Sequence, residues 1–287
     1  MTRLYSRQGV KENLVDLQEN AGVTGYPMGI YKVGTAAEAA GRFYLWAKDA
    51  GFPGAWVVGT PGLAGRATDG TSVADRGCLP YKNATVGNNY LVDYNISASV
   101  AHQNYLIDIL WINTGIVVTT TTAQTINSVT FPARDNNGAT AGEGVQVGIL
   151  VTTATTNGAQ INNTTLLYTS SDGATSRTAT MDATQLGFPA TAVAGTVVPF
   201  SLAGTDRGVQ SIQSVTLGTT YGGGAISLIA YRIIRVTSAL IANLGSPYLS
   251  FVSPGTRLYN GSCLFPMGLM SATTATVISG AAQIVER

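Results

Sequence analysis

The stretch "NYLIDILWINTGIVVTT", residues 104–120, decides the fold class. It is rich in the β-branched and aromatic residues that favour extended chain, and Gly115 interrupts it. Segments of the same kind recur at 89–100, 125–132, 145–153, 165–170, 196–202, 210–218 and 225–238, separated by Gly, Asn and Asp clusters. Many short strands at near-regular spacing, without alternating long helices, predict a mainly β fold: an antiparallel β-sandwich or jelly roll.

The threonine-rich run "IVVTTTTAQT", residues 116–125, has three interpretations: a glycosylated stalk, a cluster of catalytic hydroxyls, or a strand. A mucin-like stalk would be rich in proline and would lack the flanking Ile116 and Val117. Threonine is β-branched and suits the solvent face of a pleated sheet. We therefore predict a strand here, with valine and alternate threonines pointing inward.

Charge is scarce in this chain of 287 residues, because 11% are charged and 45% are hydrophobic. Ordinary soluble domains carry about 25% charged residues, and disorder needs high charge with low hydrophobicity. The net charge of +1 gives no field for nucleic acid or an anionic membrane, and no apolar run is long enough to span a bilayer. We expect neither partner. A surface with so little charge favours a protein covered by neighbouring subunits.

The N-terminus lacks the apolar core of a signal peptide, so we expect no export by that route. Cys78 and Cys263 are the only cysteines, and two distant cysteines make no disulfide framework. We expect two free thiols that behave as small hydrophobic residues, although their pairing stays open.

The first 71 residues differ from the rest. "TAAEAAGRFYLWAKDAG", residues 35–51, predicts a short helix, with Thr35 as N-cap, Glu38 completing a capping box and Gly51 closing the end. Residues 51–70 are rich in glycine and proline, which indicates irregular, extended chain. We therefore divide the chain into an N-terminal extended arm (1–71) and a β-sandwich domain (72–287).

Five aromatic residues stand out in that arm as candidate partner contacts. They suit an arm laid on another subunit, or equally a helix and loop packed on the chain's own β-domain. Within 72–287, "TINSVTFP" (125–132) echoes "SIQSVTLG" (211–218), which suggests two related β-units at about 72–190 and 191–287. The candidate contacts are Phe43, Tyr44, Trp46, Phe52 and Trp56.

Catalytic and metal-binding patterns are weak. The single histidine, His102, has no Gly-x-Ser-x-Gly nucleophile motif to accompany it. Asp93 and Asp108 are the most interesting carboxylates for glycoside hydrolysis, yet no aromatic platform surrounds them. The run "RDNNGATAGEG" (134–144) breaks the calcium-loop spacing and predicts a hairpin loop in which Asn137-Gly138 supplies positive φ. We expect no enzyme activity, no metal and no cofactor.

The stretch "VVPFSLAGTDRGVQSIQSVTL" (197–217) and the later "LIAYRII" (228–234) resemble virion structural proteins of tailed bacteriophages. The resemblance covers about the last two-thirds of the chain and carries no catalytic residue. It implies a β-sandwich head decoration, or cement, protein on the capsid surface. Such a protein would clamp neighbouring capsid subunits, with the major capsid protein as partner, and a homotrimer is the favoured assembly. The N-terminal segment would then be an arm that reaches neighbouring capsomers.

Two alternatives remain. One is a tail, collar or fibre component whose jelly roll binds a receptor or carbohydrate, with Tyr168, Tyr221 and Tyr259 as sugar platforms. The other is a polysaccharide-degrading enzyme that uses Asp93 and Asp108.

Overall fold

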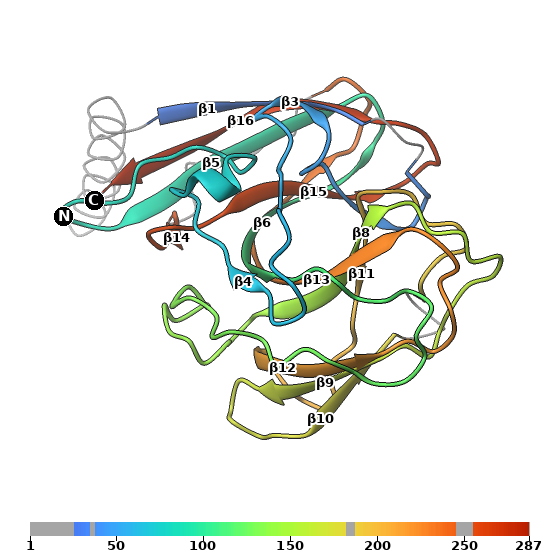
Figure 1. Cartoon of the computed structure of the whole chain (residues 1–287). Coiled ribbons are helices and arrows are strands. Elements are labelled where there is room, and N and C mark those ends of the chain that lie inside the picture. Colours follow the sequence, from blue (N-terminus) through green and yellow to red (C-terminus); the bar gives the residue numbers. More distant parts are fainter. Residues whose placement is uncertain (1–25, 35–37, 182–186, 245–254, 287) are drawn as a thin grey trace, which may run out of the picture.

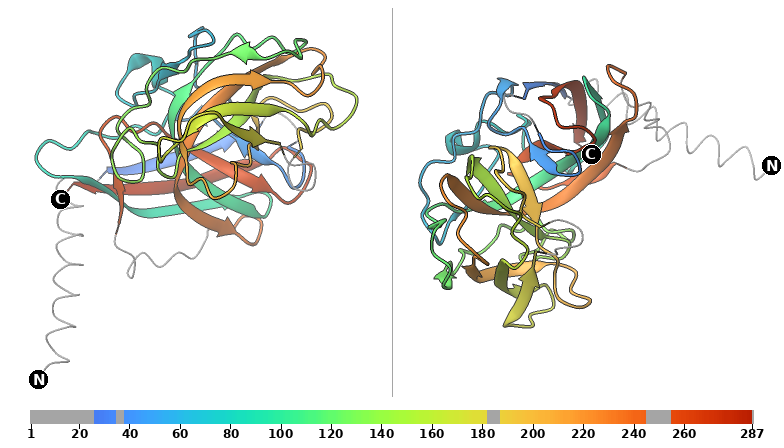
Figure 2. Two further views of the ribbon diagram at one scale, coloured as in Figure 1. Left: turned by 90° about the horizontal axis from the view of Figure 1, so that it is seen from below. Right: turned by 90° about the vertical axis from the view of Figure 1, so that its right-hand side faces the viewer.

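The computed structural model describes residues 26–34, 38–181, 187–244 and 255–286 of the chain. Over these residues the regular secondary structure comprises antiparallel strands and one three-residue 3-10 turn, η1 (Val73–Asp75). The predicted fold class, mainly β and antiparallel, is therefore confirmed. The strands form a central barrel with a smaller sheet on each of two sides (Figures 1 and 2).

Six strands close the barrel, in the order β13-β8-β11-β2-β15-β6, and β6 pairs again with β13. Closure removes the sheet edges that would otherwise expose unpaired backbone groups. The barrel strands are β2 (Phe43–Leu45), β6 (His102–Ile112), β8 (Gln146–Thr153), β11 (Thr196–Pro199), β13 (Ala225–Ala239) and β15 (Leu264–Met270), with the short β4 (Arg66–Ala67) beside β6.

Strand β13 closes the ring because it is long enough to pair with two neighbours. Residues Ala225–Tyr231 pair with β8, and Ile229–Ala239 pair with β6. The register with β6 shifts between Ala230 and Tyr231, and bulges of this kind bend a strand and increase its twist. Residues Ile226–Tyr231 of β13 are buried on both faces and are apolar apart from Ser227, because this part of the strand is covered on both sides.

Side chains of the barrel strands point alternately inward and outward, so one apolar core lies inside the barrel and two lie outside it. The barrel interior holds one of them, with Ile107 and Ile109 from β6 and residues from the other five strands. The remaining members of this interior core are Leu45, Ala47, Trp56, Cys78, Ile112, Leu150, Val197, Ile229, Tyr231, Cys263, Phe265 and Met267.

A five-stranded sheet covers one side of the barrel, in the order β14-β5-β16-β1-β3. Between this sheet and the barrel lies a second core that includes Ile30, Tyr94, Leu106 and Ile278. The strands are β14 (Thr256–Leu258), β5 (Asn89–Ala98), β16 (Val277–Glu286), β1 (Tyr26–Val33) and β3 (Ala50–Phe52).

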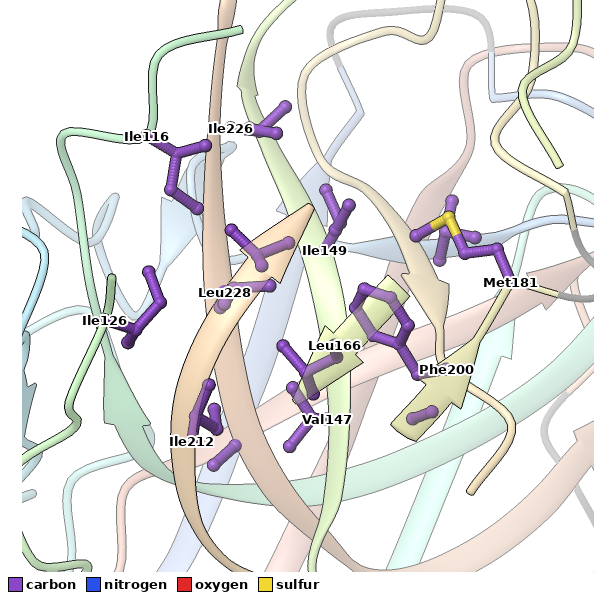
Figure 3. Packing of buried hydrophobic residues seen from close by; sticks show 14 of the residues in the cluster. Ile116, Ile126, Val147, Ile149, Leu166, Met181, Phe200, Ile212, Ile226 and Leu228 are labelled. Atoms are coloured by element: carbon purple, nitrogen blue, oxygen red, sulfur yellow. The ribbon is translucent and has the colours of Figure 1, made fainter. Parts of the chain in front are cut away.

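A four-stranded sheet covers another side, in the order β10-β9-β12-β7. Its apolar face meets the outward side chains of β8 and β13 in the third core, where Val147, Ile149, Leu166, Ile212 and Leu228 converge (Figure 3). The strands are β10 (Arg177–Thr180), β9 (Thr165–Ser170), β12 (Val209–Thr216) and β7 (Gln124–Thr125).

The helix predicted at 35–51 is wrong for every described residue of that stretch. Phe43–Leu45 form β2 between β11 and β15, and residues 50–52 form β3 beside β1. Gly41 has a φ of +72°, which suits the turn between Glu38 and β2 better than a helix. Residues 35–37, which include the proposed N-cap, lie outside the described residues.

The boundary at residue 71 does not separate an arm from the β-domain in the described chain. Strand β1 lies inside the five-stranded sheet and β2 inside the barrel. Residues 53–81, called the cover segment below, place Trp56 and Cys78 in the interior core. Residues 1–25 lie outside the described residues.

A division near residue 190 is not seen either, because strands from both proposed halves are neighbours in the same sheets. Strand β9 pairs with β12, and β5 pairs with β16. The two echoing segments lie against each other, and the Ser128 amide donates a hydrogen bond to the Ile212 carbonyl, 2.9 Å away.

The strand predicted at 116–125 is also wrong, apart from its last two residues, which form β7. The buried Gln124 side chain replaces a strand partner here. Its amide oxygen accepts from the Val117 backbone N–H at 2.8 Å, and its amide nitrogen donates to the Val117 carbonyl at 3.0 Å. These two bonds close residues 117–124 into a loop, in which Thr119, Thr121 and Thr122 are exposed.

Candidate functional site

Three of the five candidate partner contacts are buried inside the chain's own fold. Tyr44 and Trp46 lie in the core beneath the five-stranded sheet, and Trp56 lies in the barrel interior against Phe265. Phe43 is half-buried, with its ring 5.4 Å from that of Tyr105. Only Phe52 projects outward, with 53% of its surface exposed. The other four residues therefore serve the fold of this chain.

Phe52 lies on the outer side of the five-stranded sheet. Residues opposite each other on antiparallel strands point to the same side, and the register aligns two rows across the sheet. The first row is Phe52, Tyr31, Ser279 and Ser97; the second is Gly29, Ala281 and Asn95. We call these seven residues the outer face.

The two aromatic residues dominate the outer face. Tyr31 is 50% exposed and lies directly opposite Phe52 in the β1–β3 register. Phe52 reaches towards Gly29, since a Cβ at Gly29 would lie 4.0 Å from Phe52 Cδ1. Tyr31 was not among the residues predicted from the sequence, although the alternation of buried Met28, Ile30 and Lys32 with outward residues in β1 identifies it.

A second group of exposed apolar residues borders this face. Leu240, Ile241 and Leu244, which follow β13, are 78%, 62% and 56% exposed. The Asn243 amide donates to the Ala98 carbonyl at the end of β5, which fixes this segment beside the sheet. No charged residue stands in either group, and charge depletion with aromatic enrichment is typical of the core of protein interfaces.

Beneath the sheet, on the inner side of β1, Lys32 is fully buried. Its ammonium group donates to the Asp49 and Gly54 carbonyls, both at 3.1 Å. Burial lowers the pKa of Lys32 to about 8, and the charge of Asp49 opposes that shift. Nearby, the Tyr44 hydroxyl donates to Asp49, and burial raises the pKa of Tyr44. These bonds tie the residues on either side of β3 to the inner side of β1.

Glu38 is buried close to this group. Its carboxylate accepts hydrogen bonds from the backbone N–H and the hydroxyl of Thr276, at 3.1 and 3.0 Å. Burial raises the pKa of Glu38 despite those bonds. Both acceptor contacts are made to the chain itself, so this carboxylate joins the start of β2 to the start of β16.

The carboxylates proposed for glycoside hydrolysis lie in different layers. Asp93 is on β5 in the five-stranded sheet, whereas Asp108 is on β6 in the barrel wall. Asp108 is fully buried, accepts from the Cys263 amide at 2.8 Å and lies between Arg134 and Arg232. A carboxylate enclosed in this way cannot reach a glycosidic bond, so this assignment is wrong.

His102 also has a structural role. Its ring is buried, with Nδ1 2.8 Å from the Val100 carbonyl and Nε2 2.7 Å from the Asn104 amide oxygen. Trp46 covers it, with ring centroids 5.4 Å apart. Both ring nitrogens face groups of neighbouring residues, and no nucleophile lies among these contacts.

The loop at 134–144 is held by one carboxylate. Asp135 accepts from the backbone N–H groups of Asn137, Ala139, Gly142 and Glu143, at 2.8 to 3.2 Å. Its oxygens are therefore occupied by the loop itself, and Gly138 adopts the expected positive φ of +74°. Within the described ranges, no three His, Cys, Asp or Glu side chains converge as a metal site.

Two open pockets lie at the four-stranded side. One, of about 370 Å³, is lined by Glu143, Asp172, Asp206, Arg207 and neighbouring hydroxyl residues. Asp206 is already bound by Arg177 and Tyr168, and Asp172 by Ser170. The other, of about 410 Å³, is lined by uncharged residues of 156–161 and 219–222.

The proposed sugar platforms are not available on the surface. Tyr168 and Tyr221 are fully buried, and their hydroxyls bond to Asp206 and Thr164. Tyr259 is partly exposed, but its ring is covered by the guanidinium groups of Arg232 and Arg257, at 4.9 and 4.8 Å. Tyr168 and Tyr221 therefore present no open aromatic face to a sugar, and a sugar at Tyr259 would compete with the guanidinium groups.

No protein-family model matches the chain, and no curated protein matches it. Eight chains of solved structures match, among them the VP2 subviral particle of infectious bursal disease virus. That match has 10% identity and a TM-score of 0.20, and covers 92% of this chain and 80% of that chain. At these values we draw no functional conclusion from the likeness. No helix among the described residues is long and apolar enough to cross a membrane.

Proposed function

We propose that this protein is a non-enzymatic structural component of a virion, a head decoration protein that binds the capsid surface of a tailed bacteriophage. The main support for this proposal is the composition of the outer face. Its seven residues carry no charge and include two half-exposed aromatic residues, Tyr31 and Phe52, while the next row of the sheet contains Asp93. The resemblance of residues 197–217 and 228–234 to phage virion proteins supports the same function.

Apolar and charged surfaces differ in the free energy of burying them at an interface. Burying exposed apolar surface on association contributes about 25 cal/mol per Å², whereas burying unpaired charges is expensive. The outer face and the adjoining Leu240, Ile241 and Leu244 combine apolar area with an absence of charge. Repeated over a symmetric shell, individually weak contacts of this kind would clamp neighbouring capsid subunits.

Co-sedimentation with expanded capsids that lack this protein tests the proposal. We expect the wild-type chain to bind, and Tyr31→Asp or Phe52→Asp to weaken binding by about tenfold or more, because central aromatic contacts dominate interfaces. Val57→Asp is the matched control: Val57 is 77% exposed but lies on the cover segment, so this variant should bind normally.

Two results would contradict the proposal. One is a wild-type chain that does not bind the capsids. The other is equal binding by Phe52→Asp, Tyr31→Asp and the wild type, which would move the contact away from the outer face. The ratio of this chain to the major capsid protein in purified particles, measured by mass spectrometry, then distinguishes a shell component from a tail or collar component.

The alternative carbohydrate-binding function has no observation in its favour. Its proposed platforms, Tyr168 and Tyr221, are buried, and Tyr259 is covered by two arginines.

A further inference from the structure

Two thiols that are far apart in the sequence meet in the barrel interior. Cys78 lies on the cover segment and is 2% exposed, and Cys263 immediately precedes β15 and is 0% exposed. The Leu79 amide donates to the Leu264 carbonyl at 2.9 Å. The two short segments that carry the cysteines therefore lie next to each other, and both cysteines belong to the interior core.

Gly70 shows how closely the side chains approach. The Cys78 thiol donates to the Gly70 carbonyl at 3.7 Å, and the Gly70 amide donates to the Gly261 carbonyl at 2.9 Å. A Cβ at Gly70 would overlap the Ser262 carbonyl oxygen and would lie 3.4 Å from Cys78 Sγ. The Cys78 sulfur and the backbone that leads into Cys263 therefore border the same small space.

The chemistry of Cys263 agrees with direct contact between the thiols. Burial raises the pKa of the Cys263 thiol, and the hydrogen bond between Cys263 and Cys78 adds to that rise. A thiol with a raised pKa is a poor nucleophile, so it reacts slowly with an outside reagent. It would react much faster with a sulfur already held beside it.

We propose that Cys78 and Cys263 form an intramolecular disulfide bond that fastens the cover segment to the barrel. The oxidant is a small disulfide such as glutathione disulfide. The Cys78 thiolate attacks it, forms a mixed disulfide and releases one glutathione. The Cys263 thiolate then attacks the Cys78 sulfur of that mixed disulfide, which forms the internal bond and releases the second glutathione.

In this sequence of steps the protein loses two hydrogen atoms, and one glutathione disulfide becomes two glutathione molecules. Cys78 reacts first because it lies on the cover segment, which lacks long strands and needs to open only locally to admit the oxidant. The proposal does not rest on the capsid-binding function. It predicts a chain that is reduced inside a cell and becomes cross-linked in an oxidising medium.

The test uses the purified full chain in glutathione redox buffer at mildly alkaline pH, quenched with acid, unfolded and alkylated. We expect the number of alkylated thiols to fall from two to zero. Digestion with trypsin without reductant should give a disulfide-linked pair of peptides, residues 77–82 and 258–287. Reduction should separate the pair and restore both thiols.

Cys78→Ala and Cys263→Ala are the matched variants, because each removes one sulfur and keeps a small apolar side chain. Neither should form the linked peptides, and Cys263→Ala should stop at the mixed disulfide with glutathione. The oxidised wild type should also melt several degrees higher than the reduced form, because the bond constrains the unfolded chain across a long loop.

Three outcomes would overturn the proposal. Both thiols of the folded wild type could remain alkylatable after long exposure to the oxidant. Each could carry glutathione without an internal bond. Finally, the linked peptides could come only from dimers joined between chains, which non-reducing electrophoresis detects.

Discussion

Removing the carboxylate of Asp75 should detach the cover segment from the barrel. Asp75 is fully buried in η1 and accepts four hydrogen bonds. Trp56 Nε1 donates at 2.8 Å, Arg66 donates through Nη1 at 2.8 Å and Nη2 at 2.6 Å, and the Asp69 amide donates at 2.9 Å. One side chain therefore joins the indole that enters the barrel, strand β4 and the turn that precedes Cys78.

The magnitude follows from these contacts. In Asp75→Asn the side chain has no charge. Its amide N–H group also faces N–H groups that donate to the carboxylate in the wild type. Breaking a buried ion pair costs about 3–5 kcal/mol. Since the Arg66 side chain is 25% exposed, water can partly replace its lost partner, so we expect Asp75→Asn to cost roughly 3 kcal/mol.

Urea denaturation followed by tryptophan fluorescence measures this loss. With a slope of about 3 kcal/mol per M, a loss of this size lowers the midpoint by about 1 M. Asp69→Asn is the control, because Asp69 is exposed and bonds only to Thr71 through its side chain. That variant should lose less than about 1 kcal/mol.

A double-mutant cycle with Arg66→Met separates the ion pair from the other bonds, and we expect a coupling above about 1 kcal/mol. Equal stability of Asp75→Asn and Asp69→Asn would contradict this role of Asp75. So would an equal cost of Asp75→Asn with and without Arg66, because the pair would then contribute nothing.

Two further predictions concern buried charged groups. The pKa of Lys32 is lowered to about 8, below its value of about 10.4 in an unfolded chain, so the unfolded chain binds more protons between these values. The free energy of unfolding of the wild type, relative to that of Lys32→Met, should therefore stay constant below about pH 8 and increase with pH above it. Urea midpoints of the two proteins that change in parallel with pH would contradict this. Asp135→Ala should cost about 2–3 kcal/mol, because four backbone N–H groups lose their acceptor. Hydrogen exchange at residues 137–143 should accelerate, and unchanged exchange there would show that the loop holds without the carboxylate.

The predicted helix failed because local preference competes with burial. A capping interaction such as that of Thr35 and Glu38 contributes about 1 kcal/mol. Burying Tyr44, Leu45 and Trp46 contributes about 1.5–3 kcal/mol for each large side chain. The strand is therefore more stable than the helix, and Glu38 accepts hydrogen bonds from Thr276 instead of capping a helix.

The threonine run failed for a different reason. The β-preference of "IVVTTTTAQT" is real, but a strand also needs a partner along its edge. Here the Gln124 amide takes the place of that partner for Val117, and the run becomes a loop. Nothing in the local sequence distinguishes a glutamine that bonds to its own loop from one that faces solvent.

Local signals in the sequence were enough to predict the mainly β class and the position of many turns. Alternating apolar residues and the Gly and Asn clusters are local signals, because side-chain direction and positive φ depend on adjacent residues. Only the tertiary structure decided which strands pair, that the sheet closes into a barrel, and that Trp56 is buried while Phe52 is exposed. It alone brought Cys78 to Cys263, because strand pairing and burial depend on contacts between residues far apart in the chain.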